Sequence, residues 1–465
     1  MTNQQKAILF IIIDLITAAG AWFLFYVYRI SYVEEQSELV FKGNFYYGLI
    51  AIPVFWVFLY TIQGTYHNIR RVYRLKTLKL TLFGTLIGSI LIFFGLILND
   101  FVDSYTQFYV MLFVFLGIHF SLTLIPRMIF TTIYVKKIHK GIIGFNTIII
   151  GGSQKALDIL EDIKKLKQNP GYKFIGYVNI NGNDKMLDGH LEYLGHIDQI
   201  HQILADTHVD EVIIALESSD HERLKGIIAK LSGYDVKIST VPDAYDILSG
   251  QVKINSIWGA LLLYVTPTSM PDWQFSTKRL IDVGVSLVVM ILLIPFYITI
   301  AILVKASSKG PVFFKQERIG KHGKKFQIIK FRTMVQNAEK DGPQLSSSND
   351  PRITKVGKFL RKTRLDEFPQ FWCVLTGDMS LVGPRPERQY YIDQISEQDP
   401  QYLYLHKVRP GITSWGQVKF GYAENVEQMI QRMKYDLLYI RNMSLALDFK
   451  IMFYTIAIIF KGSGK

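Results

Sequence analysis

The sequence has a single cysteine, Cys373, among its 465 residues. A lone cysteine excludes a disulfide within the chain and a metal site built from several thiolates, and it fits a reducing compartment. A convincing cleavable signal peptide is also lacking, because the first apolar stretch is long enough to remain as a membrane anchor. We therefore expect the amino-terminal region to stay in the mature protein.

Charge is scarce as well, and it is unevenly distributed. Charged residues make up 20% of the chain and hydrophobic residues 49%, a balance typical of a membrane protein. The formal net charge is +13, and residues 305–364 alone carry 16 Lys and Arg against 4 Asp and Glu. Such a basic segment suits nucleic acid, anionic lipid or a phosphorylated substrate. No nucleic-acid-binding motif is apparent, so we expect membrane lipids and nucleotide phosphates as partners, and no nucleic acid.

Four long apolar stretches occupy the first third of the chain. They lie near residues 7–30, 45–63, 78–98 and 107–133. Each approaches or exceeds the ~20 residues that cross a bilayer as a helix. The loops alternate between acidic and basic, and the positive-inside rule places the basic ones in the cytoplasm. Residues 1–140 are therefore predicted to form a four-helix transmembrane bundle. His119, Pro126 and Arg127 are interpreted as packing or interface residues, with a lipid-handling role as the alternative.

Residues 141–250 have a different pattern, in which short apolar strands alternate with helical segments. This alternation predicts a parallel, Rossmann-like α/β domain. A strand at Phe145–Ile150 is followed by two glycines and a helix. The dinucleotide fingerprint is incomplete, because Ser153 occupies the second glycine position and Asn179, not an acidic residue, ends the second strand. A structural or regulatory domain is favoured over a cofactor-binding one, and nucleotide binding is left open.

Residues 251–275 are interpreted as a linker and residues 276–465 as a third domain. This domain begins with an apolar run, 283–304, that has positive residues at both ends and Pro295 inside it. A full crossing would place the following basic segment outside the cell, away from nucleotide substrates. A re-entrant helix near 278–305, kinked at Pro295, returns the chain to the cytoplasmic face. The full crossing remains the alternative.

The C-terminal apolar segment, 445–460, contains Asp448 and Lys450. Two charges inside one apolar segment suit a helix lying along the membrane interface better than one that crosses the bilayer.

The most informative run is residues 359–387, which contains the adjacent carboxylates Asp366 and Glu367. A basic stretch precedes the pair, and a Gly/Pro-rich loop, 383–386, follows it. Neighbouring carboxylates repel each other, and cations lower the energy of both charges, so this cluster suits phosphate chemistry. Taken alone, an Asp-Glu pair is more often a solvated helix start.

Cations recur along this part of the chain, and we interpret seven of them as ligands of substrate phosphate or nucleotide. They are Lys330, Arg332, Arg318, Arg361, Arg364, Arg385 and Arg409. Strand alternation is expected to place Lys330 and Arg332 on one face. Prolines on both sides of Arg385 stiffen the loop and fix its direction. The alternative is a set of solvated strand faces and structural turns.

The run 359–387, with KFRTM at 330–334 and RPGIT at 409–413, closely resembles the signature of the bacterial sugar transferases. These enzymes move a sugar-1-phosphate from a UDP-sugar onto polyprenyl phosphate. The resemblance covers about residues 270–465 closely and the rest by architecture. It implies a membrane α plus α/β protein with four transmembrane helices, a Rossmann-like cytoplasmic domain, and a catalytic α/β domain with a re-entrant membrane helix. Cys373 and Arg364 depart from the family pattern, where Asn and Ser are common.

By this resemblance, Asp366 is the nucleophile and forms a covalent aspartyl-phosphosugar, while Glu367 binds Mg²⁺ or positions the incoming phosphate. Hexose-1-phosphate passes from a UDP-sugar to undecaprenyl phosphate and UMP is released, the first membrane step of exopolysaccharide, capsule or O-antigen (lipopolysaccharide) synthesis. The expected location is the bacterial inner membrane, with the catalytic domain on the cytoplasmic face. A homodimer is compatible with the bundle.

Three alternatives remain at this stage. The first is the same reaction with a UDP-N-acetylhexosamine. The second is a non-catalytic membrane scaffold that senses a nucleotide through the α/β domain. The third is a membrane oxidoreductase, which the incomplete glycine fingerprint disfavours.

Overall fold

A computed structural model describes residues 3–460, apart from 34–37, 42, 68, 72, 98–104, 167, 181–185, 217–220, 242–261, 266–269, 337 and 339–349. The chain divides into two compact units. The first comprises Met1–Ile142 with Pro271–Leu280, and the second comprises Ile143–Met270 with Ile281–Lys465. The carboxylate pair predicted as a functional site belongs to the second unit.

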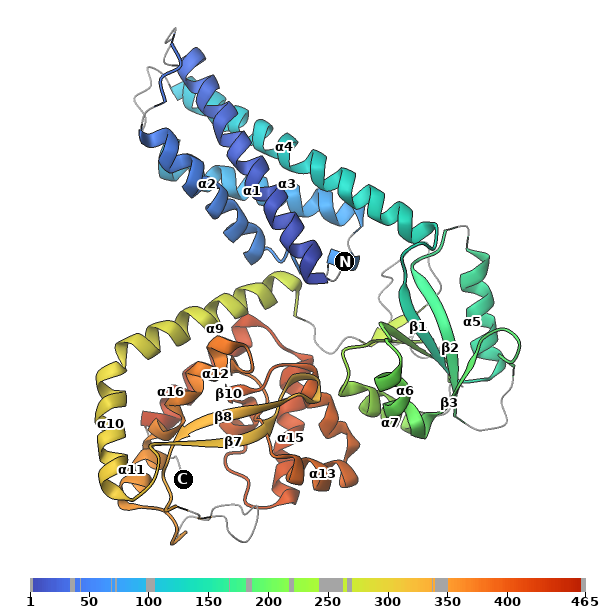
Figure 1. Ribbon diagram of the computed structural model, residues 1–465, viewed down its shortest axis with the longest axis vertical. Coiled ribbons are helices and arrows are strands. Elements are labelled where there is room, and N and C mark those ends of the chain that lie inside the picture. The colour runs from blue at the N-terminus through green and yellow to red at the C-terminus, as the bar shows by residue number, and fades with distance from the viewer. Residues whose placement is uncertain are drawn as a thin grey trace. The chain divides into compact units, whose positions relative to one another are not determined.

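The first unit is built from long apolar helices that lie side by side (Figure 1). They are α1 (Asn3–Tyr28), α2 (Gly43–Ile62), α3 (Arg74–Ile92) and α4 (Tyr105–His139), with short helical turns η1 (Arg29–Val33), η2 (Ile69–Arg71) and η3 (Phe93–Ile97). Among the described residues, four helices are long and apolar enough to cross a membrane, which confirms the four predicted apolar helices. They begin and end within a few residues of the predicted limits, except that α4 continues to His139.

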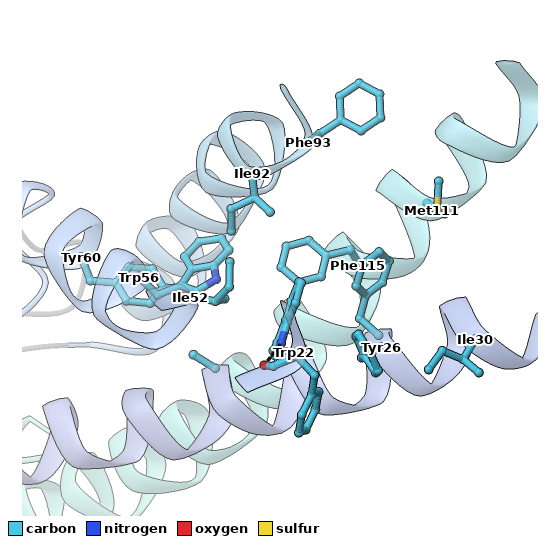
Figure 2. Close-up of a cluster of buried hydrophobic side chains, with 13 residues drawn as sticks. Trp22, Tyr26, Ile30, Ile52, Trp56, Tyr60, Ile92, Phe93, Met111 and Phe115 are labelled. Atoms are coloured by element: carbon cyan, nitrogen blue, oxygen red, sulfur yellow. Dashed lines mark hydrogen bonds between the residues drawn. The ribbon is translucent and has the colours of Figure 1, made fainter. Parts of the chain in front are cut away.

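Aromatic side chains fill the centre of this bundle (Figure 2). Trp22 of α1 donates its indole N–H to the backbone carbonyl of Phe45 at 3.1 Å. On α2, Trp56 is fully buried and stacks on His119 of α4, with 3.7 Å between ring centroids. Large aromatic rings bury much apolar surface and pack in specific geometries, so they hold these helices in one register.

A buried ion pair also joins the helices. Arg127 of α4 donates from Nε and Nη2 to the two carboxylate oxygens of Asp14 on α1, at 2.8 and 2.6 Å. The same guanidinium donates to Thr81 of α3, and Tyr66 donates to Asp14. A buried charge is tolerated when it is paired and hydrogen-bonded in this way. These contacts are the kind expected if Arg127 is a packing residue. The sequence did not indicate that its partner is Asp14.

The second unit begins with a six-stranded sheet of order β3-β2-β1-β4-β5-β6. Its strands are β1 (Phe145–Ile150), β2 (Tyr172–Asn179), β3 (Tyr193–His196), β4 (Glu211–Ile214), β5 (Lys237–Thr240) and β6 (Leu263–Val265). All neighbouring strands are parallel except β5 and β6. A parallel α/β sheet was expected here, but β3 was not, and β6 lies inside the segment 251–275 that was interpreted as a linker. That interpretation is wrong for residues 263–265 and for the helix that begins at Asp272; residues 251–261 and 266–269 lie outside the described residues.

Helices cover both faces of this sheet (Figure 1). They are α5 (Gln154–Lys165), η4 (Ile197–Gln199), α6 (Ile200–Asp206) and α7 (His221–Ser232). Successive β1 side chains point to opposite faces, so Ile149 packs with α5 whereas Ile148 and Ile150 pack with α6 and α7. At the end of β1, Gly151 has φ +123°, and a Cβ there would lie 2.5 Å from the carbonyl oxygen of Ala215. The close approach of β1 and β4 is therefore a structural reason for this glycine.

The rest of the second unit holds a hairpin surrounded by helices (Figure 1). The strands of this part are β7 (Phe313–Ile319) and β8 (Lys325–Phe331), which form the hairpin, and β9 (Ser380–Val382) and β10 (Gly411–Thr413). Helix α9 (Asp272–Leu292) begins in the first unit and continues into the second. The other helices and turns of this part are α10 (Ile294–Ser307), η5 (Lys321–Gly323), α11 (Lys355–Thr363), η6 (Leu365–Gln370), α12 (Phe371–Thr376), α13 (Gln389–Gln398), η7 (Pro400–Lys407), α14 (Trp415–Lys419), α15 (Val426–Arg441) and α16 (Leu445–Phe460). Strands β7 and β8 pair antiparallel, and β9 pairs with β10 in parallel.

The apolar run predicted to be broken at Pro295 forms two helices. Helices α9 and α10 meet at Leu293 with a bend of 64°, and Pro295 lies in the first turn of α10. Proline is favoured in a first helical turn because the missing N–H would have no helical partner there. The break is therefore where the sequence placed it, while the path of the pair through a membrane stays a prediction.

In α16, the two charges that interrupt the apolar segment point in different directions. Asp448 is buried and accepts a hydrogen bond from the hydroxyl of Tyr439 at 2.6 Å, whereas Lys450 is exposed. The aspartate is thus a packing residue of this helix. The predicted position of α16 at a membrane interface stays a prediction.

The two parts of the second unit are in contact. Lys407, at the end of η7, is buried and donates from Nζ to the backbone carbonyls of Leu231 and Tyr234 beside α7, at 3.3 and 2.9 Å. Two backbone carbonyl oxygens accept hydrogen bonds from this lysine and so tie the end of α7 to the hairpin domain. The α/β domain therefore has a direct structural connection to the part of the chain that holds the carboxylate pair.

Candidate functional site

A tight turn between two helical segments places the carboxylate pair. Helix α11 begins at a Thr354 N-cap, whose hydroxyl accepts the N–H of Gly357, and it ends at Thr363. Arg364 follows with φ 59°, a left-handed conformation that is uncommon for residues other than glycine. The chain then enters η6, where Asp366 and Glu367 each keep only 7% of their surface exposed. Burial of both carboxylates excludes the solvated helix start.

Glu367 is surrounded by cations from three elements. Its Oε1 accepts a hydrogen bond from Lys330 Nζ on β8 at 2.7 Å and one from Arg385 Nη2 at 3.4 Å. Arg364 Nη1 forms an ion pair with Oε2 at 3.8 Å. Burial alone would raise the pKa of Glu367, but Lys330, Arg385 and Arg364 outweigh it and hold the pKa well below the usual value. Glu367 is therefore ionised at neutral pH.

Asp366 has a different environment from its neighbour. Burial raises its pKa to about 6, and the negative charge of Glu367 adds to this shift, while Lys330, Arg361 and Arg364 oppose it. Among the described residues, nothing donates a hydrogen bond to its buried Oδ1. An ionised carboxylate oxygen with no competing donor is available to attack an electrophile. Their surroundings thus give the two carboxylates different roles. Cations neutralise Glu367, whereas Asp366 is available to react.

The loop that carries Arg385 is fixed by close contact between two chain segments. Strands β9 and β10 pair in parallel, and the backbone N–H of Gly411 donates to Pro384 at 2.9 Å. A Cβ at Gly383 would lie 2.3 Å from the carbonyl oxygen of Arg409. Only glycine permits this approach, and the prolines on both sides of Arg385 restrict its backbone. The rigid loop points the guanidinium at Glu367.

Lys330 and Arg332 do not share a face as predicted. Strand β8 ends at Phe331, so the alternation that would have aligned them stops before Arg332. Lys330 contacts Glu367, whereas Arg332 donates from Nη2 to the backbone carbonyl and hydroxyl of Ser308, at 2.7 and 3.0 Å. The prediction of one shared cationic face is therefore wrong.

The remaining predicted cations have hydrogen-bond partners other than the two carboxylates. Arg361 donates from Nε to Thr333 Oγ1 at 3.0 Å, and its charge still lowers the pKa of Asp366. Arg409 donates to the backbone carbonyl of Gly377, and Arg318 pairs with Glu387. The structure thus brings Lys330, Arg364 and Arg385 to Glu367, while Arg318 and Arg409 contact other groups.

Three further residues support the site and were not among the predicted set. Tyr297 of α10 donates its hydroxyl to the backbone carbonyl of Phe368 at 2.9 Å, which ties the bent helix to η6. Glu387 and Arg432 form an ion pair at 2.7 Å beside the Arg385 loop. Glu387 directly follows the Gly/Pro-rich loop and could have been noticed for that reason. Arg432 lies in an ordinary amphipathic helix, and nothing in its local sequence marks it.

The carboxylate pair offers the type of ligand that a magnesium ion bound together with a substrate would use. No group of three or more His, Cys, Asp or Glu side chains suited to a metal occurs among the described residues. Mg²⁺ commonly uses one or two carboxylates and completes its shell with phosphate oxygens and water. The pair Asp366 and Glu367 can supply such carboxylate oxygens. Cys373 is no competitor as a reactive group, because burial raises its thiol pKa and its Sγ donates to the carbonyl of Gln327.

Comparison with known proteins gives two family matches. Residues 273–462 match the family described as bacterial sugar transferase, and residues 61–242 match a family described as CoA-binding domain. The first match contains every residue of the candidate site, and the second contains the parallel sheet up to β5.

Several named relatives are similar to part of this chain. The UDP-N-acetylgalactosamine-undecaprenyl-phosphate N-acetylgalactosaminephosphotransferase of Aeromonas hydrophila is 40% identical over 51% of this chain and 55% of its own length. The UDP-glucose:undecaprenyl-phosphate glucose-1-phosphate transferase of Klebsiella pneumoniae is 38% identical over 58% of both chains. The exopolysaccharide production protein PSS of Rhizobium leguminosarum bv. phaseoli is 37% identical over 38% of this chain and 92% of its own length. The chain thus spans little more than half the length of the first two.

Proposed function

Because this chain belongs to the bacterial sugar transferase family, we propose that it transfers a sugar-1-phosphate from a UDP-sugar to undecaprenyl phosphate and releases UMP. The observation that carries the proposal is the buried pair in which Glu367 is neutralised by Lys330, Arg364 and Arg385 while Asp366 keeps a free oxygen. This is a phosphoryl-transfer site with a nucleophile and a set of charge-neutralising groups.

The reaction proceeds in two displacements. Asp366 Oδ1 attacks the β-phosphorus of the UDP-sugar, forms an O–P bond and breaks the bridging P–O bond, so UMP leaves and the sugar phosphate stays on the enzyme. A phosphate oxygen of undecaprenyl phosphate then attacks the same phosphorus. The acyl-phosphate bond breaks, the carboxylate of Asp366 is restored, and undecaprenyl diphosphate sugar is released. Two easier steps replace one difficult displacement.

The cations reduce the repulsion between a carboxylate nucleophile and an anionic substrate. Lys330 and Arg385 are held by Glu367, the chain neighbour of the nucleophile, so they can stabilise charge that develops on the transferring phosphate. Arg361 and Arg364 add positive charge near Asp366. Mg²⁺, bound by Glu367 and the diphosphate, would supply further charge neutralisation. The remaining predicted phosphate ligands, Arg332 and Arg409, are proposed to act at the edges of the site.

The sugar is proposed to be a hexose or an N-acetylhexosamine. Both classes are supported, because relatives named for glucose and for N-acetylgalactosamine match this chain at similar identity. The test is UMP release by the purified protein with UDP-glucose and with UDP-N-acetylgalactosamine, each with Mg²⁺ and undecaprenyl phosphate. Release with at least one sugar, dependent on the lipid phosphate for turnover, is expected. No release with a broad UDP-sugar panel would contradict the proposal and favour the scaffold alternative.

The proposed location is the bacterial inner membrane, with the carboxylate pair on the cytoplasmic face, where UDP-sugars are present. The bend between α9 and α10 supports a re-entrant path that begins and ends on that face. Cysteines introduced at Ser276 and Lys309 should then react with a membrane-impermeant reagent only in inside-out vesicles. Labelling of the two positions from opposite sides would show that α9 and α10 cross the membrane.

The proposed role is the first membrane step of exopolysaccharide, capsule or O-antigen synthesis, and a homodimer stays a prediction.

The raised pKa of Asp366 predicts an acid limb in the rate of UMP release. The attacking species is the carboxylate, so the rate should fall as pH decreases through about 6, where Asp366 takes up a proton. Replacing Glu367 by glutamine removes a negative neighbour and frees Lys330, and both changes lower the pKa of Asp366. The acid limb of Glu367→Gln should therefore move to lower pH, even though the rate itself falls. An unchanged or higher midpoint would show that Asp366 does not control this limb.

A further inference from the structure

Arg318 was predicted to contact phosphate, but the structure gives it a different partner. Its Nη1 donates to Glu387 Oε2 at 2.9 Å and to the backbone carbonyl of Pro386 at 3.1 Å. The other carboxylate oxygen of Glu387 accepts a hydrogen bond from Arg432 Nη2 at 2.7 Å. All three side chains are largely buried, with 14%, 6% and 7% of their surfaces exposed for Arg318, Glu387 and Arg432. Each oxygen of Glu387 thus has its own guanidinium.

These three residues, the Glu387 triad, join a strand and a helix to one loop. Arg318 lies on β7, Arg432 lies on α15, and Glu387 follows Arg385 by two residues. The backbone also takes part, because Ile319 N–H donates to the carbonyl of Glu387 at 3.1 Å. Buried ion clusters are often no more stabilising than apolar side chains of similar size. Stability alone therefore does not account for three buried charges at this position.

The loop that the triad holds is the one that points Arg385 at Glu367. Asp436, one helical turn after Arg432 on α15, accepts hydrogen bonds from the backbone N–H groups of Arg385 and of Gly416, the latter at 2.8 Å. Burial lowers the pKa of Arg385, but the charges of Glu367 and Glu387 outweigh it. The Arg385 side chain thus lies between two carboxylates, and Glu367 is the one that accepts a hydrogen bond from its guanidinium.

The charge balance of the triad has a direct consequence for Arg385. A carboxylate two residues away could pair with Arg385 and turn it away from the site. Arg318 and Arg432 each take one oxygen of Glu387, so the carboxylate is already satisfied and Arg385 stays directed at Glu367. The same two contacts anchor the loop to β7 and α15.

We propose that Glu387, held by Arg318 and Arg432, is a positioning residue that fixes Arg385 for phosphoryl transfer. This inference rests on the proposed function, because its readout is UMP release. It assigns Arg318 a positioning role in place of a contact with substrate phosphate. Misplacing a catalytic group by about 1 Å can cost ~10²-fold in rate. Glu387→Gln, which keeps the shape and removes the charge, should therefore lower kcat for UMP release by about 10²-fold.

The test is a double-mutant cycle between Glu387→Gln and Arg385→Ala. Arg385→Ala alone should cost about 10²–10³-fold in kcat. If Glu387 acts through Arg385, the double variant should be no slower than Arg385→Ala. Multiplied losses, or a Glu387→Gln rate within about twofold of the wild type, would overturn the proposal. Glu317→Gln is the matched control, because Glu317 is the neighbouring carboxylate on β7 and forms its ion pair with the exposed Lys325, so the rate of this variant should be unchanged.

Two additions keep the outcomes distinct. If Glu387→Gln does not fold, Arg432→Lys replaces it, because lysine keeps the charge but not the planar guanidinium. Arg432→Lys should lower kcat by less than Glu387→Gln, and this loss should likewise disappear when Arg385→Ala is also present. The affinity of the wild type, the two single variants and the double variant for UDP is also measured by calorimetry. This measurement does not require turnover. A wild type that binds UDP but releases no UMP would contradict the proposed function, and non-additive UDP affinities would still support the triad. A wild type that binds no UDP would overturn both.

Discussion

Asp366→Asn is expected to reduce UMP release by on the order of 10³-fold or more, because the amide cannot form the covalent intermediate. The substitution keeps the size of the side chain, and Oδ1 of Asp366 accepts no hydrogen bond from the described residues, so little packing is lost. The variant should also remove a charge that repels Glu367. We therefore expect it to be folded and at least as stable as the wild type.

The matched control for Asp366→Asn is Asp378→Asn. Asp378 lies in the same part of the chain, but it is exposed and accepts a hydrogen bond from Thr376. Its replacement should leave the rate within about twofold of the wild type, as is usual for exposed residues outside a site. An Asp366→Asn protein that still supported polysaccharide synthesis in cells would favour the scaffold alternative.

Lys330→Met is the second substitution with a large expected effect, and it should lower both activity and stability. Lys330 makes the shortest contact of Glu367, at 2.7 Å, and both groups are largely buried. Removing one partner of a buried ion pair leaves the other charge uncompensated and typically costs about 3–5 kcal/mol. Arg385 and Arg364 compensate Glu367 in part, so we expect the lower end of that range. Losing a cation beside the transferring phosphate should also cost about 10²–10³-fold in rate.

A second substitution separates these two effects. In Lys330→Met/Glu367→Gln both charges are removed, so the thermal midpoint in detergent should recover towards that of the wild type. The rate of UMP release should stay low, because the cation and the carboxylate are both missing. Recovery of the rate together with the midpoint would show that Lys330 serves only to stabilise Glu367.

The element types could be predicted well from the sequence because their patterns are local. Four apolar stretches of sufficient length gave the helices α1 to α4, and Phe145–Ile150 gave β1 with its observed limits. The break near Pro295 follows from the ring of proline itself. Strand β3, with the sequence YLGH, was missed because it lacks the continuous apolar run that marks the equally short β4, and β6 has only three residues.

The pairing of charges was much harder to predict, because it depends on segments far apart in the chain. Arg127 and Asp14 are separated by 113 residues, and Arg432 and Glu387 by 45. The sequence identified Asp366, Glu367 and the cations around them through the motif. It did not reveal that Arg318 is neutralised by Glu387, or that β8 ends before Arg332, so two of the predicted phosphate ligands received other partners.

The most direct test of the account is the intact mass of the purified protein after incubation with UDP-sugars and Mg²⁺ in the absence of undecaprenyl phosphate. We expect an added sugar phosphate with one of the UDP-sugars, which is lost in Asp366→Asn and removed when undecaprenyl phosphate is supplied. No adduct, together with UMP release only when undecaprenyl phosphate is present, would contradict the covalent route and require a different role for Asp366.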